Sequence, residues 1–188
     1  MIICISGLAG SGKTTATGII KTYLVERNYT VRNYNSDKVA AQIYPEVYAN
    51  ILNSLDSDYS NEELSTIYNC IYLLLAEAFT LNPNLVIITD GMYRKASQRL
   101  LLRNIAEKAN LKFYLLKMEI LESLALQRLK QRQVGGGHGG WVETIHYEEP
   151  YDKNLRKIPN NGNLTDLITN VKSISSELFG EEYYFKTL

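Results

Sequence analysis

Residues 7–14 match the pattern G-x-x-x-x-G-K-[ST] at every fixed position, and this loop constrains the fold more than any other feature of the chain. Glycines let a backbone wrap closely around a polyphosphate, so that consecutive N–H groups point inward and bind its oxygens. In such a loop, Lys13 would reach the β- and γ-phosphates and the Thr14 hydroxyl would bind Mg²⁺. The sequence therefore predicts a nucleoside triphosphate site made of Gly7, Leu8, Ala9, Gly10, Ser11, Gly12, Lys13, Thr14 and Thr15.

The sequence on both sides of this loop supports that interpretation. The run Ile2–Ile5 is short, apolar and β-branched, as expected of a buried parallel strand. After the loop, apolar residues recur at helical spacing as far as about residue 28. The alternative, a purely structural glycine-rich turn with an exposed lysine, does not require a strand before the loop and a helix after it.

The composition sets limits on the class of protein. With 188 residues, we expect one domain, residues 1–188, with a sizeable core. Lys+Arg and Asp+Glu number 20 each, so no global basic field would recruit nucleic acid. Cys4 and Cys70 form no metal or redox motif. Met1 leads directly into a strand and no apolar run approaches membrane-spanning length, so we expect a soluble cytoplasmic protein without membrane contact.

Strand-like and helix-like patterns alternate along the chain, which predicts a three-layer α/β domain with a parallel sheet. The predicted strands are 2–5, 30–35, 85–89, 111–117 and, marginally, 156–159. The predicted helices are about 14–28, 38–43, 46–54, 61–81, 93–109, 119–133, 141–148 and 164–179. The helix at 61–81 begins with a capping box, in which Ser60 is followed by Glu63.

Asp90 follows an apolar strand that we expect in the middle of the sheet. Ligands of parallel α/β sheets bind at the carboxyl ends of the strands, so Asp90 would lie beside Thr14 and the metal ion. The alternative is that Asp90 caps the helix that follows. Gly91 stands where water-activating ATPases commonly have glutamate, and no N-K-x-D guanine signature occurs, so transfer to a bound acceptor is favoured over motor ATPase or GTPase activity.

Asp37 closes the second predicted strand, at the same edge of the sheet. In phosphoryl transfer one carboxylate accepts the proton of the acceptor hydroxyl, and Asp37 is the best candidate for this base and for a substrate contact. Its alternative role is the N-cap of the helix at 38–43.

Arginines supply further candidates for binding phosphate or an anionic acceptor. Arg128 and Arg132 are one helical turn apart, directly before the glycine-rich segment 135–140, so we predict a lid at about 128–148 whose arginines assist catalysis. The alternative is that they stabilise a helix C-terminus without a ligand. Arg94, on the helix predicted after Asp90, lies closest to the expected acceptor site and is the candidate for substrate binding.

Taken together, these motifs resemble those of the small P-loop kinases that include polynucleotide 5′-hydroxyl kinases, zeta-toxin-like and chloramphenicol-phosphotransferase-like enzymes, and AAA-type kinases. The resemblance covers about residues 1–180 and implies a five-stranded parallel sheet in the order 2-3-1-4-5, the use of ATP and Mg²⁺, and phosphorylation of a hydroxyl. It also implies that Asp37 is the general base and that Arg128 and Arg132 belong to the lid. The polynucleotide kinases carry an arginine in the helix after this aspartate; residues 38–42 of this chain contain none, which disfavours a nucleic-acid acceptor.

We therefore expect an ATP-dependent kinase that phosphorylates a hydroxyl of a small molecule. One alternative is a nucleoside, nucleotide or polynucleotide 5′-hydroxyl kinase. Another is an ATP-dependent binding or regulatory switch with little transfer activity. The acceptor and the oligomeric state are not indicated by any pattern in the chain.

Overall fold

The computed structural model describes residues 1–53, 59–82, 84–133 and 155–180. It contains one five-stranded sheet in the order β2-β3-β1-β4-β5, with every pair of neighbours parallel. The predicted fold class and strand order are therefore confirmed. The strands are β1 (Ile2–Ser6), β2 (Val31–Asn35), β3 (Val86–Asp90), β4 (Phe113–Glu119) and β5 (Arg156–Pro159). The helices are α1 (Lys13–Val25), α2 (Ser36–Ile43), α3 (Pro45–Asn53), α4 (Asn61–Leu81), α5 (Ala96–Lys108), α6 (Glu122–Gln133) and α7 (Leu164–Phe179).

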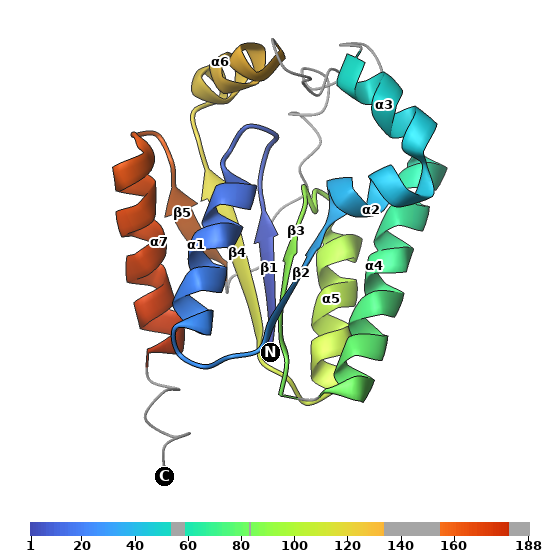
Figure 1. The fold of residues 1–188 in the computed structure, drawn as a ribbon, viewed down its shortest axis with the longest axis vertical. Coiled ribbons are helices and arrows are strands. Elements are labelled where there is room, and N and C mark those ends of the chain that lie inside the picture. The colour runs from blue at the N-terminus through green and yellow to red at the C-terminus, as the bar shows by residue number, and fades with distance from the viewer. Residues whose placement is uncertain (54–58, 83, 134–154, 181–188) are drawn as a thin grey trace.

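Helices cover both faces of the sheet (Figure 1). Successive side chains of a strand point to opposite faces, so β1 contributes to two separate cores. Ile2 and Cys4 pack in the cluster that contains the buried residues of α4 and α5. Ile3 and Ile5 pack in the cluster that contains those of α1 and α7. Because β1 is fully buried between β3 and β4, the loop that follows it starts from the central strand of the sheet.

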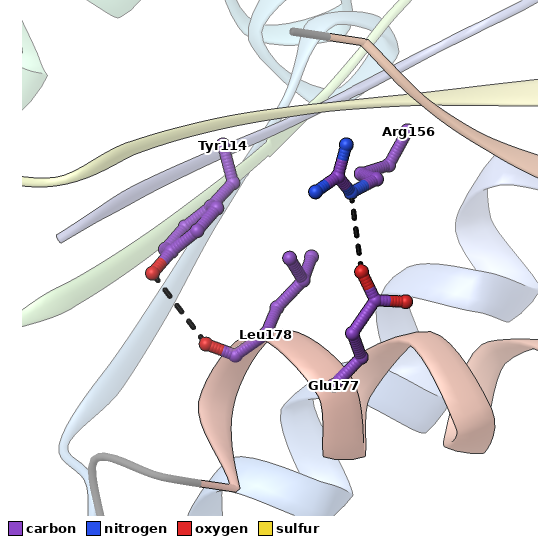
Figure 2. A network of polar contacts seen from close by, with 4 residues as sticks. All are labelled: Tyr114, Arg156, Glu177 and Leu178. Atoms are coloured by element: carbon purple, nitrogen blue, oxygen red, sulfur yellow. Dashed lines mark hydrogen bonds and ion pairs between the residues drawn. The ribbon is translucent and has the colours of Figure 1, made fainter.

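The carboxyl ends of all the strands meet at one edge of the sheet, shown at the top of Figure 1. The β1–α1 loop, the start of α2, and helices α3 and α6 lie at this edge. At the other side of the molecule, α7 is attached to the sheet by polar contacts near its C-terminal end (Figure 2). Tyr114 of β4 donates a hydrogen bond to the Leu178 carbonyl at 3.5 Å, and Arg156 of β5 pairs with Glu177 at 3.3 Å.

Several element boundaries differ from the sequence-based prediction by one to three residues, and two helices begin three residues later than predicted. The helix predicted from residue 93 begins at Ala96, because Tyr93 adopts a φ of 43°, which interrupts a helix. The helix predicted from residue 119 begins at Glu122, because β4 continues to Glu119 to pair with β5. The helix predicted at 141–148, the glycine-rich segment 135–140 and most of the predicted lid lie outside the described residues.

Helix α4 corrects the expectation about apolar length. Among the described residues, α4 is the one helix that is long and apolar enough to cross a membrane: it has 21 residues, and an 18-residue stretch of it has a mean hydropathy of 1.4. Ile67, Ile71 and Leu75 of this helix are buried in the core against the sheet. The core helix of a globular domain meets the same criterion, so length and hydropathy assign no membrane role to α4. Its N-terminus carries the predicted capping box, with reciprocal hydrogen bonds between Ser60 and Glu63.

Candidate active site

The loop between β1 and α1 has the geometry of a phosphate cradle. Gly12 has a φ of 91°, a conformation that residues with a Cβ rarely adopt, and it lies directly before the first turn of α1. Lys13 extends back over the loop, where its Nζ donates to the carbonyls of Gly7 at 2.9 Å and Leu8 at 2.8 Å. The N-terminus of α1 and the Lys13 ammonium therefore place positive charge at the same side of the loop, as an anion site requires.

Asp90 lies at the carboxyl end of β3 and is fully buried. Its Oδ2 accepts hydrogen bonds from Asn35 Nδ2 at 2.8 Å and from Thr14 Oγ1 at 3.3 Å. Burial raises the pKa of this carboxyl, while the bond from Asn35 and the positive charge of Lys13 act in the opposite direction. Asp90 does not cap α5, whose N-cap is Lys95, so the geometry favours the position beside Thr14 over the capping alternative.

The same carboxylate has one oxygen to spare for a metal ion. Asp90 Oδ1 is buried and has no hydrogen-bond partner among the residues that the structure describes. These residues include no cluster of three or more His, Cys, Asp or Glu side chains that could hold a metal by themselves. Mg²⁺ in phosphoryl-transfer sites is commonly bound through one or two protein oxygens, with phosphate and water oxygens completing the shell. Thr14 and Asp90 fit that pattern.

The position of Asp37 corrects one detail of the sequence-based prediction. It lies in the first turn of α2 and does not end β2. The residue that ends β2 and caps α2 is Asn35, whose Oδ1 accepts from the Lys38 backbone N–H at 2.9 Å. The capping alternative for Asp37 is therefore wrong, and its exposed side chain stands at the positive end of a helix. Its negative charge contributes to the raised pKa of Asp90. Burial is the main cause of the raised pKa of Tyr48 in α3, and the charge of Asp37 raises that pKa further.

Arg94 lies in the segment between β3 and α5, one residue before the N-cap of α5, so its predicted place on the helix is wrong. A buried arginine of α5 holds this segment: Arg99 Nη1 donates to the carbonyls of Tyr93 at 2.7 Å and Arg94 at 2.8 Å. Tyr68 of α4 accepts a hydrogen bond from the Tyr93 backbone N–H at 3.3 Å. Burial raises the pKa of Tyr68 to about 12, and the charges of Asp37 and Arg94 act on it in opposite directions. The charges of Arg94 and Asp37 therefore both act on the same buried tyrosine.

The predicted lid arginines are on α6, at the same edge of the sheet (Figure 1). Arg128 Nη2 donates to the Gly162 carbonyl at 3.0 Å, in the loop between β5 and α7. The backbone of Arg132 belongs to α6, and its side chain lies outside the described part of the structure. The structure therefore brings Arg128 next to the β5–α7 loop and assigns neither arginine a phosphate contact.

A cavity of about 300 Å³ adjoins the phosphate loop on the side of β4. Its lining includes Leu8 of the loop, the last residues of β4, and Asn161 from the β5–α7 loop. The Asn161 side chain accepts a hydrogen bond from the Leu121 backbone N–H at 2.6 Å, which joins two walls of the cavity. Small-molecule sites in proteins have volumes from about 300 Å³ upward, so the cavity is large enough for part of a nucleotide.

Sequence reasoning missed two asparagines at this edge of the sheet. Asn35 binds Asp90, and Asn160, directly after β5, donates its Nδ2 to the Ser11 carbonyl at 2.7 Å. Both stand where a parallel strand ends, and that position was the available signal. This position alone does not indicate a functional asparagine, because asparagine is common in turns, whereas the carboxylates of Asp37 and Asp90 indicate proton transfer and metal binding directly.

The fold and the site together define a P-loop protein with the architecture of the small P-loop kinases. A family model described as "AAA domain" matches residues 2–146, and the chain belongs to this family. No curated protein matches the chain in sequence.

Solved structures show the same fold at low sequence identity. Kti12 of Chaetomium thermophilum in complex with ADP-AlF3 has a TM-score of 0.70 and 19% identity, covering 93% of this chain and 97% of that one. A gluconokinase from Sinorhizobium meliloti has a TM-score of 0.68 and 15% identity, covering 99% and 97%. The Mycobacterium tuberculosis APS kinase CysC in complex with AMPPNP and APS has a TM-score of 0.66 and 12% identity, covering 92% and 94%.

Proposed function

We propose that this protein is an ATP-dependent kinase that transfers the γ-phosphoryl group to a hydroxyl of a small-molecule acceptor. In this proposal it acts as one cytoplasmic domain of the small P-loop kinase group that includes polynucleotide kinase, zeta-toxin-like and chloramphenicol-phosphotransferase-like enzymes. The observation that carries the proposal is the arrangement at one edge of the sheet. The phosphate loop with Lys13, the Thr14–Asp90 pair and the exposed carboxylate of Asp37 all lie there.

The phosphates would lie in the loop formed by residues 7–15. Lys13 already has its ammonium over this loop, so it would exchange its bonds to the Gly7 and Leu8 carbonyls for bonds to the β- and γ-phosphates. The cavity beside Leu8 would take the base and ribose. Two structural neighbours support this assignment, since Kti12 was solved with ADP-AlF3 and the APS kinase with AMPPNP.

Thr14 and Asp90 would hold Mg²⁺, which when bound neutralises charge on the β- and γ-phosphates. The role of this chain is to fix both protein ligands before the ion binds. The hydrogen bond from Asn35 keeps Asp90 Oδ2 oriented and stabilises the ionised carboxylate in a buried place. The second oxygen, Oδ1, is left free to face the ion.

Asp37 would accept the proton of the acceptor hydroxyl as its oxygen attacks the γ-phosphorus. The bond from that phosphorus to the β–γ bridging oxygen then breaks, and ADP leaves. Arg94, held by the carbonyl contact to Arg99, and the tyrosines of α3 and α4 would form the acceptor side. Arg128 and Arg132 would add positive charge when the segment after α6 closes over the phosphates. The gluconokinase and a sugar kinase among the structural neighbours favour a hydroxyl of a small molecule as the acceptor.

The proposal is tested by a transfer screen with γ-labelled ATP and Mg²⁺. Nucleosides, sugars, aminoglycosides and short 5′-hydroxyl oligonucleotides serve as acceptors, and wild type, Asp37→Asn and Lys13→Ala are compared. We expect label in one small-molecule class, loss of about 10²-fold or more in turnover for Asp37→Asn with ATP binding retained, and loss of ATP binding or turnover for Lys13→Ala. Glu107→Gln, an exposed carboxylate near the C-terminal end of α5, is the matched control and should keep full activity.

Each other outcome points to a different function. Label only on oligonucleotides would identify a polynucleotide 5′-hydroxyl kinase and refute the small-molecule acceptor. Slow release of free phosphate that Asp37→Asn does not change, with a partner protein bound only in the presence of ATP, would identify a switch protein and refute the kinase.

A further inference from the structure

Asn160 links the far edge of the sheet to the phosphate loop. It follows β5 directly, is 4% exposed, and its backbone N–H donates to the Glu119 carbonyl at 2.8 Å. Its side-chain Nδ2 donates to the Ser11 carbonyl at 2.7 Å, a contact between residues 149 positions apart in the chain. A buried amide held by its own backbone in the sheet is a rigid donor, because neither its main chain nor its side chain is free to follow the loop.

The geometry of the peptide bond turns this contact into an orientation of the loop. A trans peptide is planar, and its C=O and N–H point in opposite directions. The structure has no cis peptide bonds among the described residues. Because the Ser11 carbonyl points to Asn160, the Gly12 N–H points away from Asn160, which lies on the side of the loop that is packed against the end of β5 and against α7. That N–H is one of the donors on which a phosphate cradle depends.

The conformation of Gly12 explains why the Ser11–Gly12 peptide needs a hydrogen bond to hold its orientation. Its φ of 91° requires glycine, and glycine also allows the preceding peptide plane to rotate more freely than any other residue. A Cβ placed on Gly12 would approach Asn160 Nδ2 to 2.4 Å and Leu167 Cδ2 to 3.6 Å, so the outer side of the loop is packed against the end of β5 and against α7. The packing and the hydrogen bond together select one orientation of a peptide that could otherwise turn.

We propose that Asn160 is a positioning residue of the nucleotide site, which fixes the Ser11–Gly12 peptide plane so that the Gly12 N–H faces the phosphates. This inference rests on the proposed nucleotide site and adds to it a residue outside the P-loop motif. Pre-organising a donor raises affinity because the ligand no longer bears the cost of ordering it. Asn160 itself touches no phosphate in this proposal, so it acts only through the loop.

The first test measures ADP affinity by competition with a fluorescent nucleotide in wild type, Asn160→Ala and Asn160→Asp. We expect ADP affinity to fall roughly 5- to 20-fold in Asn160→Ala, as for loss of one oriented hydrogen bond, and further in Asn160→Asp, whose carboxylate would face the Ser11 carbonyl. The affinity for adenosine, which has no phosphate, should change less than twofold. The matched control is Asn170→Ala, because Asn170 Nδ2 also donates to a backbone carbonyl, that of Pro159 at 2.9 Å, without contacting the loop.

The second test observes the Gly12 N–H directly. Only Gly7 and Gly12 follow a serine in the sequence, so labelling serine carbonyls with ¹³C and glycine nitrogens with ¹⁵N gives two filtered amide signals, both from the phosphate loop. In wild type we expect ADP to shift both signals. In Asn160→Ala and Asn160→Asp at saturating ADP, the Gly7 shift should persist and the Gly12 shift should be lost or reversed. The complete set of glycine amide signals reports whether each variant is folded.

The outcomes separate this proposal from the proposed function. Wild-type ADP affinity and an unchanged Gly12 shift in a folded Asn160 variant would overturn the positioning role and leave the nucleotide site intact. Equal losses of adenosine and ADP affinity would also overturn it, because a general loosening of the fold does not distinguish phosphate from nucleoside. No ADP response in the wild-type protein would overturn the nucleotide site, and this inference with it.

Discussion

The contact between Asn35 and Asp90 allows a prediction in which one atom is changed and the rest of the local structure is kept. Asn35 Oδ1 caps α2 by accepting from the Lys38 N–H at 2.9 Å, and Nδ2 donates to Asp90 Oδ2 at 2.8 Å. Aspartate is as good an N-cap as asparagine, so Asn35→Asp keeps the first bond. The substitution replaces the donor to Asp90 by a second carboxylate oxygen.

The size of the effect follows from this geometry. A hydrogen bond to a charged group is worth about 1.5–3 kcal/mol, and it is lost. Two carboxylates whose charges lie about 4 Å apart repel each other by about 4 kcal/mol at an effective dielectric constant of about 20. The pair relieves part of this repulsion by holding one proton, as coupled carboxylates do. We therefore expect Asn35→Asp to lower the free energy of unfolding by about 3–5 kcal/mol at pH 8. The loss should be smaller at pH 5, because the higher proton concentration favours protonation of the carboxylate pair and so reduces its repulsion.

Urea unfolding at pH 5 and pH 8 measures this prediction, and an exchange of the two residues controls for it. The double variant Asn35→Asp with Asp90→Asn rebuilds the same bond in the opposite direction, because the amide at position 90 can donate to the carboxylate at position 35. It should recover at least half of the stability that Asn35→Asp loses at pH 8. Asn33→Asp, at an exposed position of β2, should cost less than 1 kcal/mol. A loss below 1 kcal/mol for Asn35→Asp, or no recovery in the exchanged pair, would refute the reasoning.

Two other predictions concern the same edge of the sheet. Burial raises the pKa of Asp90 in the folded state, so the protein loses stability as pH rises from about 4, the pKa of an unfolded aspartate, through the raised folded value; Asp90→Asn removes this loss. Urea midpoints across that range should therefore move in favour of Asp90→Asn as pH rises, and parallel curves would contradict the assignment. Arg99→Met should cost about 3 kcal/mol, because it leaves the Tyr93 and Arg94 carbonyls without their buried donor. Arg103→Met removes a guanidinium that lies over a ring, with its Cζ 5.6 Å from the Phe113 centroid, and should cost less than about 1 kcal/mol; equal losses in the two urea midpoints would show that the buried contacts add nothing.

The sequence sufficed for the fold because the signals were local and strong. Apolar β-branched runs before the loop and before Asp90 are typical of strands buried on both faces, and both proved fully buried. The alternation of such runs with helical periodicity leaves few topologies for a parallel sheet. The strand order itself came from the resemblance to the small P-loop kinases, since no local pattern ranks five parallel strands in space.

The start of α5 was predicted wrongly because it depends on contacts between residues far apart in the chain. Residues 93–95 continue into the periodicity of α5, but Arg99 of that helix reaches back and bonds the carbonyls of Tyr93 and Arg94, which holds this segment outside the helix. The positive φ of Tyr93 is stabilised by a buried contact to Tyr68, which lies 25 residues earlier. A helix start that depends on such distant contacts cannot be predicted from the spacing of apolar residues along the helix itself.

The site was predicted incompletely for a related reason, and the two missed asparagines show what a better rule would use. In a parallel sheet, the residues that end the strands are brought to one edge whatever their separation in the chain. Asn35 and Asp90 end neighbouring strands and are hydrogen-bonded, and Asn160 follows the edge strand and reaches the loop after β1. The charged residues at this edge have chemical roles that can be inferred from their residue type alone. A buried carboxylate and a glycine-rich loop, however, both require a neutral donor that fixes them without adding charge, and an amide at a strand end is the side chain that can supply it.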